Sequence, residues 1–429
     1  MLSAAERRLD RNLPLLNYYS MLRGCLFILP VLAPFVHDRL RLDFFHLMLS
    51  EAIFAAAVVI CEVPSGWLAD VWRRVDVLRV SACLSLAAVI LIWVADGFWV
   101  FALGQVVMGI SISLQSGADS ALLYDSLQAR ARAARFLPLE ARRGGLALVV
   151  TALAALVGGL LYQLNPLLLW AADSIAAAAA IAIACFLTEP PRQRLSGHSR
   201  AFPRVFRAVA ESFQTAPLLY GLIVAIAAVF AVTKIVLFLT QAFYMAYALP
   251  LAWFGPLAAG FFAVSALGGF LASWVRERLS LANFLILLLL LLVLMMIGVV
   301  VIDRLQALPL LFLAGLISGI VRPVGVTEIN HRVSSEYRAT VLSIAGLIYQ
   351  ISFIVVAPMA GFAASQWGPT WALGGTVLIC LPFGLGAAWQ VYQANRREAM
   401  KADCHRVGLP TMLAPPSIND RYHLNQGEK

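Results

Sequence analysis

The sequence is poor in charged residues. Asp, Glu, Lys and Arg make up 13% of its 429 residues, whereas a soluble domain averages about 25%. Hydrophobic residues supply 61% of the chain. So few charges cannot cover a water-exposed surface in the ordinary way. The composition therefore excludes a typical soluble domain and indicates a membrane protein.

Lysine is almost absent. Lys234 is the only lysine before residue 401, so arginine carries nearly all of the positive charge. The formal net charge of +9 would suggest a nucleic-acid partner for a soluble protein. In a membrane protein, an excess of basic residues in the inner loops explains this charge better. We therefore expect no nucleic-acid partner.

Motifs for catalysis and cofactor binding are also lacking. The six cysteines show neither metal-ligand spacing nor a disulfide framework, and no two histidines form a ligand pair. The sequence contains no nucleotide-binding P-loop and no nucleophile triad. We expect no enzyme activity, no metal, no cofactor and no ATP-driven pumping by this chain.

Long apolar runs are abundant instead. The run 281–302 can cross about 30 Å of hydrocarbon as a helix. The runs are continuous rather than alternating, which favours helices over a barrel. The predicted fold class is an all-α integral membrane protein with twelve transmembrane helices. These are expected near 13–36, 44–66, 76–95, 98–122, 142–163, 166–187, 217–245, 252–275, 281–302, 307–329, 339–364 and 369–392.

A polar segment divides these spans into two groups of six. Residues 66–74 (GWLADVWRR) also line up with 269–277 (GFLASWVRE), between the second and third spans of each half. We therefore expect two six-helix bundles related by a pseudo-two-fold repeat. The predicted parts are an N-terminal bundle (1–187), a cytoplasmic linker (188–216), a C-terminal bundle (217–392) and a cytoplasmic tail (393–429).

The arginines predict the orientation of the chain. If both termini are cytoplasmic, the outer loops hold only Arg39, Arg41 and Arg304, while most other arginines fall in inner segments. Such asymmetry is what the positive-inside rule describes. We expect a multi-pass monomer in contact with the lipid bilayer, with both termini in the cytoplasm.

A carboxylate and an arginine cluster follow the second predicted span, in residues 62–81 (EVPSGWLADVWRRVDVLRVS). Gly66 would let two helices approach closely. Asp70 would lie at the membrane boundary, where it can accept hydrogen bonds from helix N-terminal amides or pair with an arginine. A pair made in one conformation and broken in another acts as a latch.

This stretch resembles the signature loop of the major facilitator superfamily, G-x-L-A-D-x-x-G-R-[KR]-x-x-[LV]. Arg73 stands where the second glycine is usual, and Val71 where a basic residue is common. Residues 62–65, 116–127 and 337–343 resemble a bacterial branch related to drug:proton antiporters. The residues that match the signature are Gly66, Leu68, Ala69, Asp70, Arg74 and Leu78.

The resemblance implies two bundles that rock about a site near the midplane, with spans one, four, seven and ten lining a cavity. It places the protein in a bacterial inner (plasma) membrane. Asp125 would join Asp70 and Arg74 in the latch. Two antiporter-associated motifs are eroded, because Gln105 replaces an arginine before Gly109 and the fifth span keeps only Gly158-Gly159.

Three cations fall inside predicted spans, where a charge costs about 2.5–3.5 kcal/mol at the helix centre. They are Arg23, Lys234 and Arg322. One interpretation is that each is paired within its bundle and fixes helix packing. The other is that Arg23 and Lys234 face a shared cavity and bind a carboxylate, phenolate or phosphate. The substrate-binding candidates are Arg23, Lys234, Arg322, Gln241 and Tyr19.

Intramembrane acids are candidates for proton coupling, which needs a carboxylate whose surroundings change as the cavity opens. Asp119 is the leading candidate because the fourth span lines the cavity in the family, and a structural ion pair is its alternative role. We expect structural roles for Glu51, Glu62 and Asp173; Glu328 is a further candidate.

Three functions fit these observations. The first is a secondary active transporter of small organic solutes that works by alternating access, as proton-coupled efflux. The second is an importer of an organic anion or metal chelate, which the cavity cations suggest. The third is a membrane sensor or scaffold that kept the fold and lost transport.

Overall fold

The computed structural model describes residues 4–191, 217–333 and 338–406, and every regular element in these ranges is helical. The predicted cytoplasmic linker falls mostly outside the described residues, as does the last part of the predicted tail. The side chain of Asp70 also lies outside them, although its backbone belongs to a helix.

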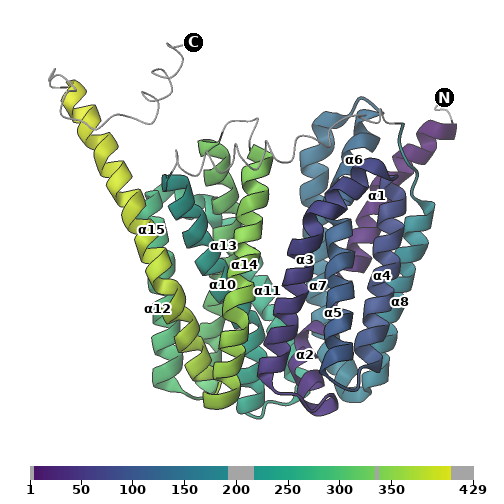
Figure 1. The fold of residues 1–429 in the computed structure, drawn as a ribbon, viewed down its shortest axis with the longest axis horizontal. Coiled ribbons are helices and arrows are strands. Elements are labelled where there is room, and N and C mark those ends of the chain that lie inside the picture. The colour runs from purple at the N-terminus through teal and green to yellow at the C-terminus, as the bar shows by residue number, and fades with distance from the viewer. Residues whose placement is uncertain (1–3, 192–216, 334–337, 407–429) are drawn as a thin grey trace.

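The helices form two bundles side by side (Figure 1). The N-bundle contains α1 (Ala4–Arg23), α2 (Leu32–Pro34), α3 (Phe44–Val71), α4 (Arg74–Val94), α5 (Phe98–Gln115), α6 (Ala118–Gln128), α7 (Phe136–Leu164) and α8 (Pro166–Phe186). The C-bundle contains α10 (Pro217–Ala246), α11 (Phe254–Arg278), α12 (Leu281–Ile302), α13 (Leu308–Arg332), α14 (Arg338–Trp367) and α15 (Pro369–Arg406). We call the end where α1 begins and α15 ends the terminal end, and the opposite one the far end.

Eleven helices in the described residues are long and apolar enough to cross a membrane. They correspond to every predicted span except the first. The first was predicted as one continuous helix over 13–36, but α1 ends at Arg23 and the chain continues through irregular backbone and short helical turns to Arg39. The first crossing is therefore broken near its middle, at Gly24–Ile28.

Polar side chains fix several helix ends. Asp43 caps α3, because its carboxylate accepts a hydrogen bond from the backbone amide of His46 at 3.1 Å. Burial alone would raise the pKa of Asp43, but the hydrogen bonds from His46 outweigh it and hold the pKa below its usual range. Gly117, at φ +80°, separates α5 from α6, a left-handed conformation that glycine adopts without strain.

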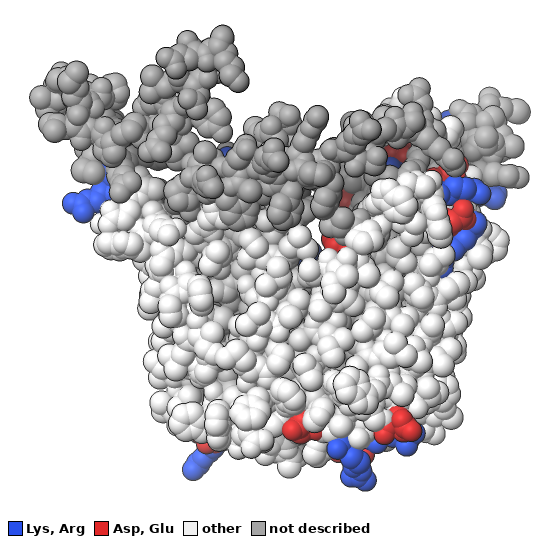
Figure 2. All heavy atoms as spheres, viewed as in Figure 1, with Lys and Arg blue, Asp and Glu red and all other residues white. Residues whose placement is uncertain are grey.

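The surface matches a protein that crosses a bilayer. Figure 2 shows charged side chains near the two ends of the molecule and a band without them between. Large apolar side chains are exposed along this band, among them Ile60, Leu148 and Phe270. In water such a surface would be unstable, whereas in lipid it is the expected exterior.

The two bundles meet closely at the far end. Here the amide of Phe45 in α3 donates to the hydroxyl of Ser365 in α14 at 2.8 Å. A Cβ built at Gly159 of α7 would lie 2.7 Å from the nitrogen of Gly255 in α11, so only glycine permits this approach. The contacts that join the bundles thus include a tight seam away from the terminal end.

Candidate functional site

Arg74 and Asp125 of the predicted latch are brought together by the structure. Arg74 opens α4, and its guanidinium forms an ion pair with Asp125 of α6. The same guanidinium donates to the carbonyl of Ala121 at 2.8 Å. Both partners belong to the N-bundle, so in this conformation the pair braces one bundle rather than linking the two.

Gly66 differs from its expected role. The residue is exposed, and nothing lies within 4 Å of a Cβ built there. The close helix approach that was expected at Gly66 is found elsewhere, for example at Gly159 and Gly255. The predicted contacts of Asp70 lie outside the described residues.

Glu189 lies at the terminal end of the N-bundle and was not among the residues predicted from the sequence. Its carboxylate accepts hydrogen bonds from the amides of Arg74 at 3.2 Å and Val75 at 3.0 Å, at the N-terminus of α4. A carboxylate in this position satisfies free amides and complements the helix dipole. An acid directly after the sixth span was the available signal, but its partner is more than a hundred residues away.

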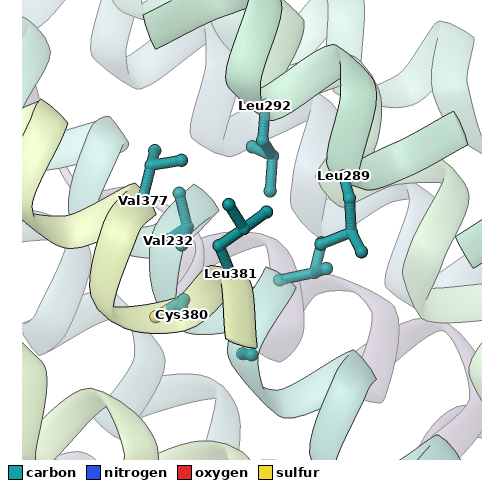
Figure 3. Close-up of a pocket in the computed structure, with 8 residues that line it drawn as sticks. Val232, Leu289, Leu292, Val377, Cys380 and Leu381 are labelled. Atoms are coloured by element: carbon teal, nitrogen blue, oxygen red, sulfur yellow. The ribbon is translucent and has the colours of Figure 1, made fainter. Parts of the chain in front are cut away.

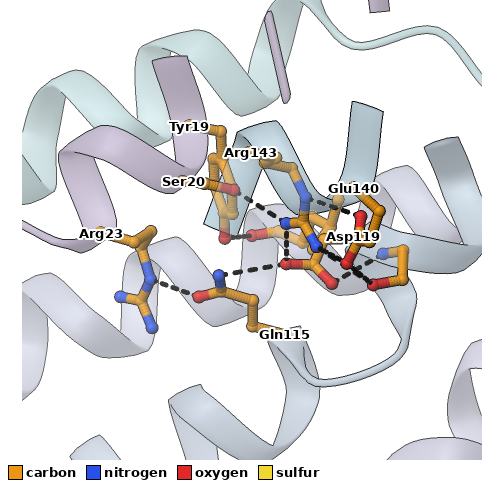
Figure 4. Close-up of polar contacts among 9 residues, drawn as sticks. Tyr19, Ser20, Arg23, Gln115, Asp119, Glu140 and Arg143 are labelled. Carbon is orange, nitrogen blue, oxygen red and sulfur yellow. Dashed lines mark hydrogen bonds and ion pairs between the residues drawn. The ribbon is translucent and has the colours of Figure 1, made fainter. Parts of the chain in front are cut away.

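Asp119 lies in a buried polar network (Figure 4). Arg143 of α7 forms an ion pair with Asp119 at 2.5 Å and a second with Glu140 at 2.6 Å. Arg143 also donates to the hydroxyl of Ser20 on α1 at 2.8 Å. Asp119 and Arg143 are 6% and 7% exposed, so the pair is sealed inside the N-bundle. Sequence spacing gave no sign of Arg143 as its partner.

Arg23 extends this network through Gln115 (Figure 4). Its Nε donates to Gln115 at 2.7 Å, and one terminal nitrogen donates to Ser111 at 2.8 Å. Gln115 in turn donates to Asp119 at 3.3 Å. The guanidinium is therefore held by neutral groups of α5, and no described acid lies within ion-pair distance of it.

Tyr19 and Gln241 have structural partners. The side chain of Tyr19 is fully buried, and its hydroxyl donates to the carbonyl of Leu78 at 3.2 Å. Gln241 of α10 accepts from the amide of Ala33 at 2.9 Å and donates to the carbonyl of Leu29 at 3.0 Å. In this conformation neither side chain is free to meet a solute.

Lys234 lies on α10 and faces both bundles. Its ammonium donates to Gln350 at 3.4 Å and stands 3.8 Å from the ring centre of Phe353, both on α14. Glu51, on α3 of the other bundle, lies close enough for an electrostatic interaction with Lys234 but forms no direct ion pair with it. These contacts are weak for a charge inside a membrane span, so Lys234 keeps capacity for another acceptor.

Glu51 is fixed by Gln105, the residue that replaces the family's arginine. The amide of Gln105 on α5 donates to Glu51 at 2.8 Å, and both side chains are at least nine-tenths buried. The sequence marked Gln105 only as a departure from the family motif. The structure makes it the polar partner of the buried Glu51.

Arg322 is exposed although it lies within the membrane span Leu305–Arg332. Among the described residues it has no hydrogen bond and no ion pair. The neighbouring Glu328, on the same helix, is instead buried and paired with Arg276 at 2.5 Å and with Arg332. Arg276 occupies the repeat position of Arg73, one residue before Arg74. Each bundle thus carries a brace between an arginine and a carboxylate after its second span, although the two arginines are not at the same repeat position.

Two internal hollows differ in chemistry. One lies in the C-bundle, holds about 10 Å³ and is lined by hydrocarbon and the Cys380 thiol (Figure 3). The other lies in the N-bundle, holds about 40 Å³, and includes Arg23, Ser85 and Asp173 in its wall. Neither is large enough for a drug-sized solute, whose pockets span hundreds of cubic ångströms.

Among the described residues, no group of three potential metal ligands exists.

Comparisons with known proteins agree with this architecture. The family profile for the Major Facilitator Superfamily matches residues 18–308. Among solved structures, a mutant of the nucleoside transporter NupG superposes with a TM-score of 0.71 at 13% identity, covering 90% of this chain and 99% of that one. An inward-facing, unoccupied bacterial homologue of the human lysosomal transporter Spinster superposes with a TM-score of 0.70 at 16% identity, covering 92% and 99%.

A D-xylose–proton symporter is also similar, with a TM-score of 0.66 at 14% identity over 90% of this chain and 97% of that one. No curated protein matches the sequence. The structural likenesses, all under 20% identity, show the fold, and the profile match covers more than half of the chain. These comparisons do not confirm the predicted relation to the drug:proton antiporter branch. This non-enzymatic, multi-pass membrane transporter therefore belongs to the major facilitator superfamily.

Proposed function

We propose that the protein is a secondary transporter for a small, negatively charged organic solute, which it carries by alternating access between its two bundles. The exposed Arg322 inside a membrane span, which has no partner among the residues that the structure describes, is the observation that carries this proposal. A cation facing lipid at this depth costs several kcal/mol, so we place it in a water-filled space between the bundles. A cation in such a space, with no acceptor in the described part of the chain, attracts an anion.

Lys234 supports the same substrate class. Its ammonium is held only by a long hydrogen bond to Gln350 and by the face of Phe353. A carboxylate or phosphate would give Lys234 a stronger, charge-assisted hydrogen bond than either of these groups. Glu51 belongs to the other bundle, so its distance from Lys234 would change as the bundles move. The competition between Glu51 and the solute for the ammonium of Lys234 would change with it.

The contacts between the bundles support an inward-open state. The seam at the far end joins α3 to α14 and α7 to α11. With both termini in the cytoplasm, as the arginine distribution predicts, the far end faces outward and the solute space opens inward. The sequence resemblance favours proton-coupled efflux from a bacterial inner membrane, and import of an organic anion uses the same cations in the opposite direction.

Solute transport in proteoliposomes tests the proposal. The purified protein would be screened with pairs of solutes that match in size and differ only in one negative charge, with and without a pH gradient. We expect transport of the charged member, with a loss of about tenfold or more in Arg322→Gln, because a charged hydrogen bond is worth about 1.5–3 kcal/mol. Arg322→Lys should retain part of the activity.

Arg304→Gln is the matched control, because Arg304 is exposed outside the long helices. Equal transport of charged and neutral solutes, or full activity in Arg322→Gln, would contradict the assignment of substrate class. Binding of a solute without transport would favour the sensor or scaffold. Accumulation driven by an imposed pH gradient would decide coupling and direction.

A further inference from the structure

A hollow with Arg23, Ser85 and Asp173 in an otherwise largely apolar wall lies inside the N-bundle, away from the proposed solute space. Residues of α1, α4, α5 and α8 and of the irregular segment after α1 line it, and its volume is about 40 Å³. An internal space of about 10–15 Å³ is enough for one water molecule, so this hollow is large enough for a small ion or a few waters. It lies where the first membrane crossing is broken.

Asp173 of α8 is the acid of this hollow. Its side chain is 5% exposed, and Oδ1 accepts a hydrogen bond from the backbone amide of Phe27 at 3.0 Å. Its other oxygen, Oδ2, is buried and has no hydrogen-bond partner among the described residues. Asp173 thus holds the irregular backbone with one oxygen and leaves the other unsatisfied.

No described neighbour neutralises this carboxylate. Arg23 lines the same hollow, but its guanidinium is bonded to Gln115 and Ser111, and no ion pair to Asp173 forms. Cys25 donates its thiol hydrogen to the carbonyl of Met21. The α4 and α5 residues in the wall are Ser85, with a neutral hydroxyl, and the apolar Val89, Ile92 and Met108.

An ionised carboxylate without a counter-charge is very costly in an apolar interior, so such a group is found either protonated or bound to a cation. Irregular backbone at membrane depth is tolerated where it is buried in protein or lines a cavity. Here the break at Gly24–Ile28 lies against Asp173.

We propose that Asp173 and the broken segment after α1 form a binding site for a small monovalent cation, a proton on Oδ2 or a Na⁺ ion. The site lies within one bundle and is separate from Lys234 and Arg322. Occupancy neutralises Asp173 and leaves the bond from Phe27 in place. The inference goes beyond solute transport, and its test needs no solute.

The test uses the purified full-length protein in detergent. Infrared spectra in Na⁺-free potassium buffer at neutral pH report whether a buried carboxyl is protonated, and thermal melts in Na⁺ against K⁺ report sodium binding. We expect either a protonated-carboxyl band or a Na⁺-dependent rise in melting temperature, and its loss in Asp173→Asn. The asparagine keeps an oxygen for the amide of Phe27 and removes the charge.

Asp96→Asn is the matched control, because Asp96 is an exposed acid of the same bundle and should leave both signals unchanged. If the asparagine variant does not fold, Asp173→Glu can assign the signal, because glutamate keeps a carboxyl group but shifts its infrared band. The proposal would be overturned if the wild-type protein shows neither signal. It would also be overturned if the wild-type signal is unaltered in both Asp173 variants. Transport in proteoliposomes is read separately, so failure of one proposal does not imply failure of the other.

Discussion

The side-chain amide of Gln241 joins the two bundles through the backbone of the broken first crossing. It accepts from the amide of Ala33 and donates to the carbonyl of Leu29, at 2.9 and 3.0 Å. Both bonds lie on the far side of the break from Arg23, within the part of the first crossing that packs against α10. Gln241 therefore helps to hold the two bundles together at the far end, and we expect both bonds to break if that end opens.

Gln241→Ala should shift the protein toward the state that is open at the far end. Two hydrogen bonds are worth about 1–2 kcal/mol together, so the ratio of the two states should change about 5- to 30-fold. Distances between spin labels placed across the far-end seam would measure this ratio. Gln306→Ala, at an exposed position outside the long helices, is the control. An unchanged distance distribution would remove Gln241 from the gate.

Arg74 and Asp125 should depend on each other. Each side chain is less than one-fifth exposed, and a hydrogen bond between charged groups contributes about 1.5–3 kcal/mol. Arg74→Ala and Asp125→Ala should each lower the melting temperature, and the double variant should be little worse than either. The neighbouring exposed pair of Arg73 and Asp76 should contribute about 0–1 kcal/mol, so Arg73→Ala is the control. Additive effects at Arg74 and Asp125 would argue against a shared contact.

Asp119→Asn should chiefly destabilise the N-bundle. The substitution removes one of two acids that face a buried arginine, and breaking a buried pair costs about 3–5 kcal/mol. Thermal melts of the purified protein would show the loss, with Asp96→Asn as the comparison. A variant that melts like wild type but no longer responds to a pH gradient would instead support the proton-coupling role predicted from the sequence.

Asp43 makes a pH-dependent contribution to stability at the N-terminus of α3, which lies at the far end of the molecule. Because the folded-state pKa of Asp43 is held below its usual range, its stabilising effect is present above the unfolded value of about 3.9 and is lost as the pH falls through the lower folded value. Asp43→Ala should remove about 1 kcal/mol at neutral pH by loss of the cap. The difference between wild type and Asp43→Ala should shrink at pH values below about 4; a difference that grows there would contradict this account.

Hydropathy, which is a local pattern, predicted the helical fold class. The pairing of Arg74 with Asp125 joins residues 51 positions apart, and it was expected only because the sequence resembles a known family. Hydropathy could not predict the break after Arg23, since apolar residues continue through it to Val36. The break depends on Asp173 and Gln241, which lie far along the chain and satisfy its backbone groups. Partners such as Arg143 and Glu189 were missed for the same reason.

The residues proposed for the solute site show the same limit. Sequence position alone put Arg23, Lys234 and Arg322 in membrane spans, but only the folded chain separates their roles. Arg23 is held by Gln115 and Ser111 inside one bundle, Lys234 faces α14, and Arg322 is exposed. These differences come from the direction of each side chain on its helix, which composition does not determine.

The central claim is that Arg322 faces water between the bundles rather than lipid. Thiol labelling of Arg322→Cys, in a background without the native cysteines, tests it directly, using a charged reagent that does not cross membranes. The account predicts rapid labelling from the side of the membrane that carries the chain termini and slow labelling from the other side. Absence of labelling from either side, as for a residue in lipid, would contradict it.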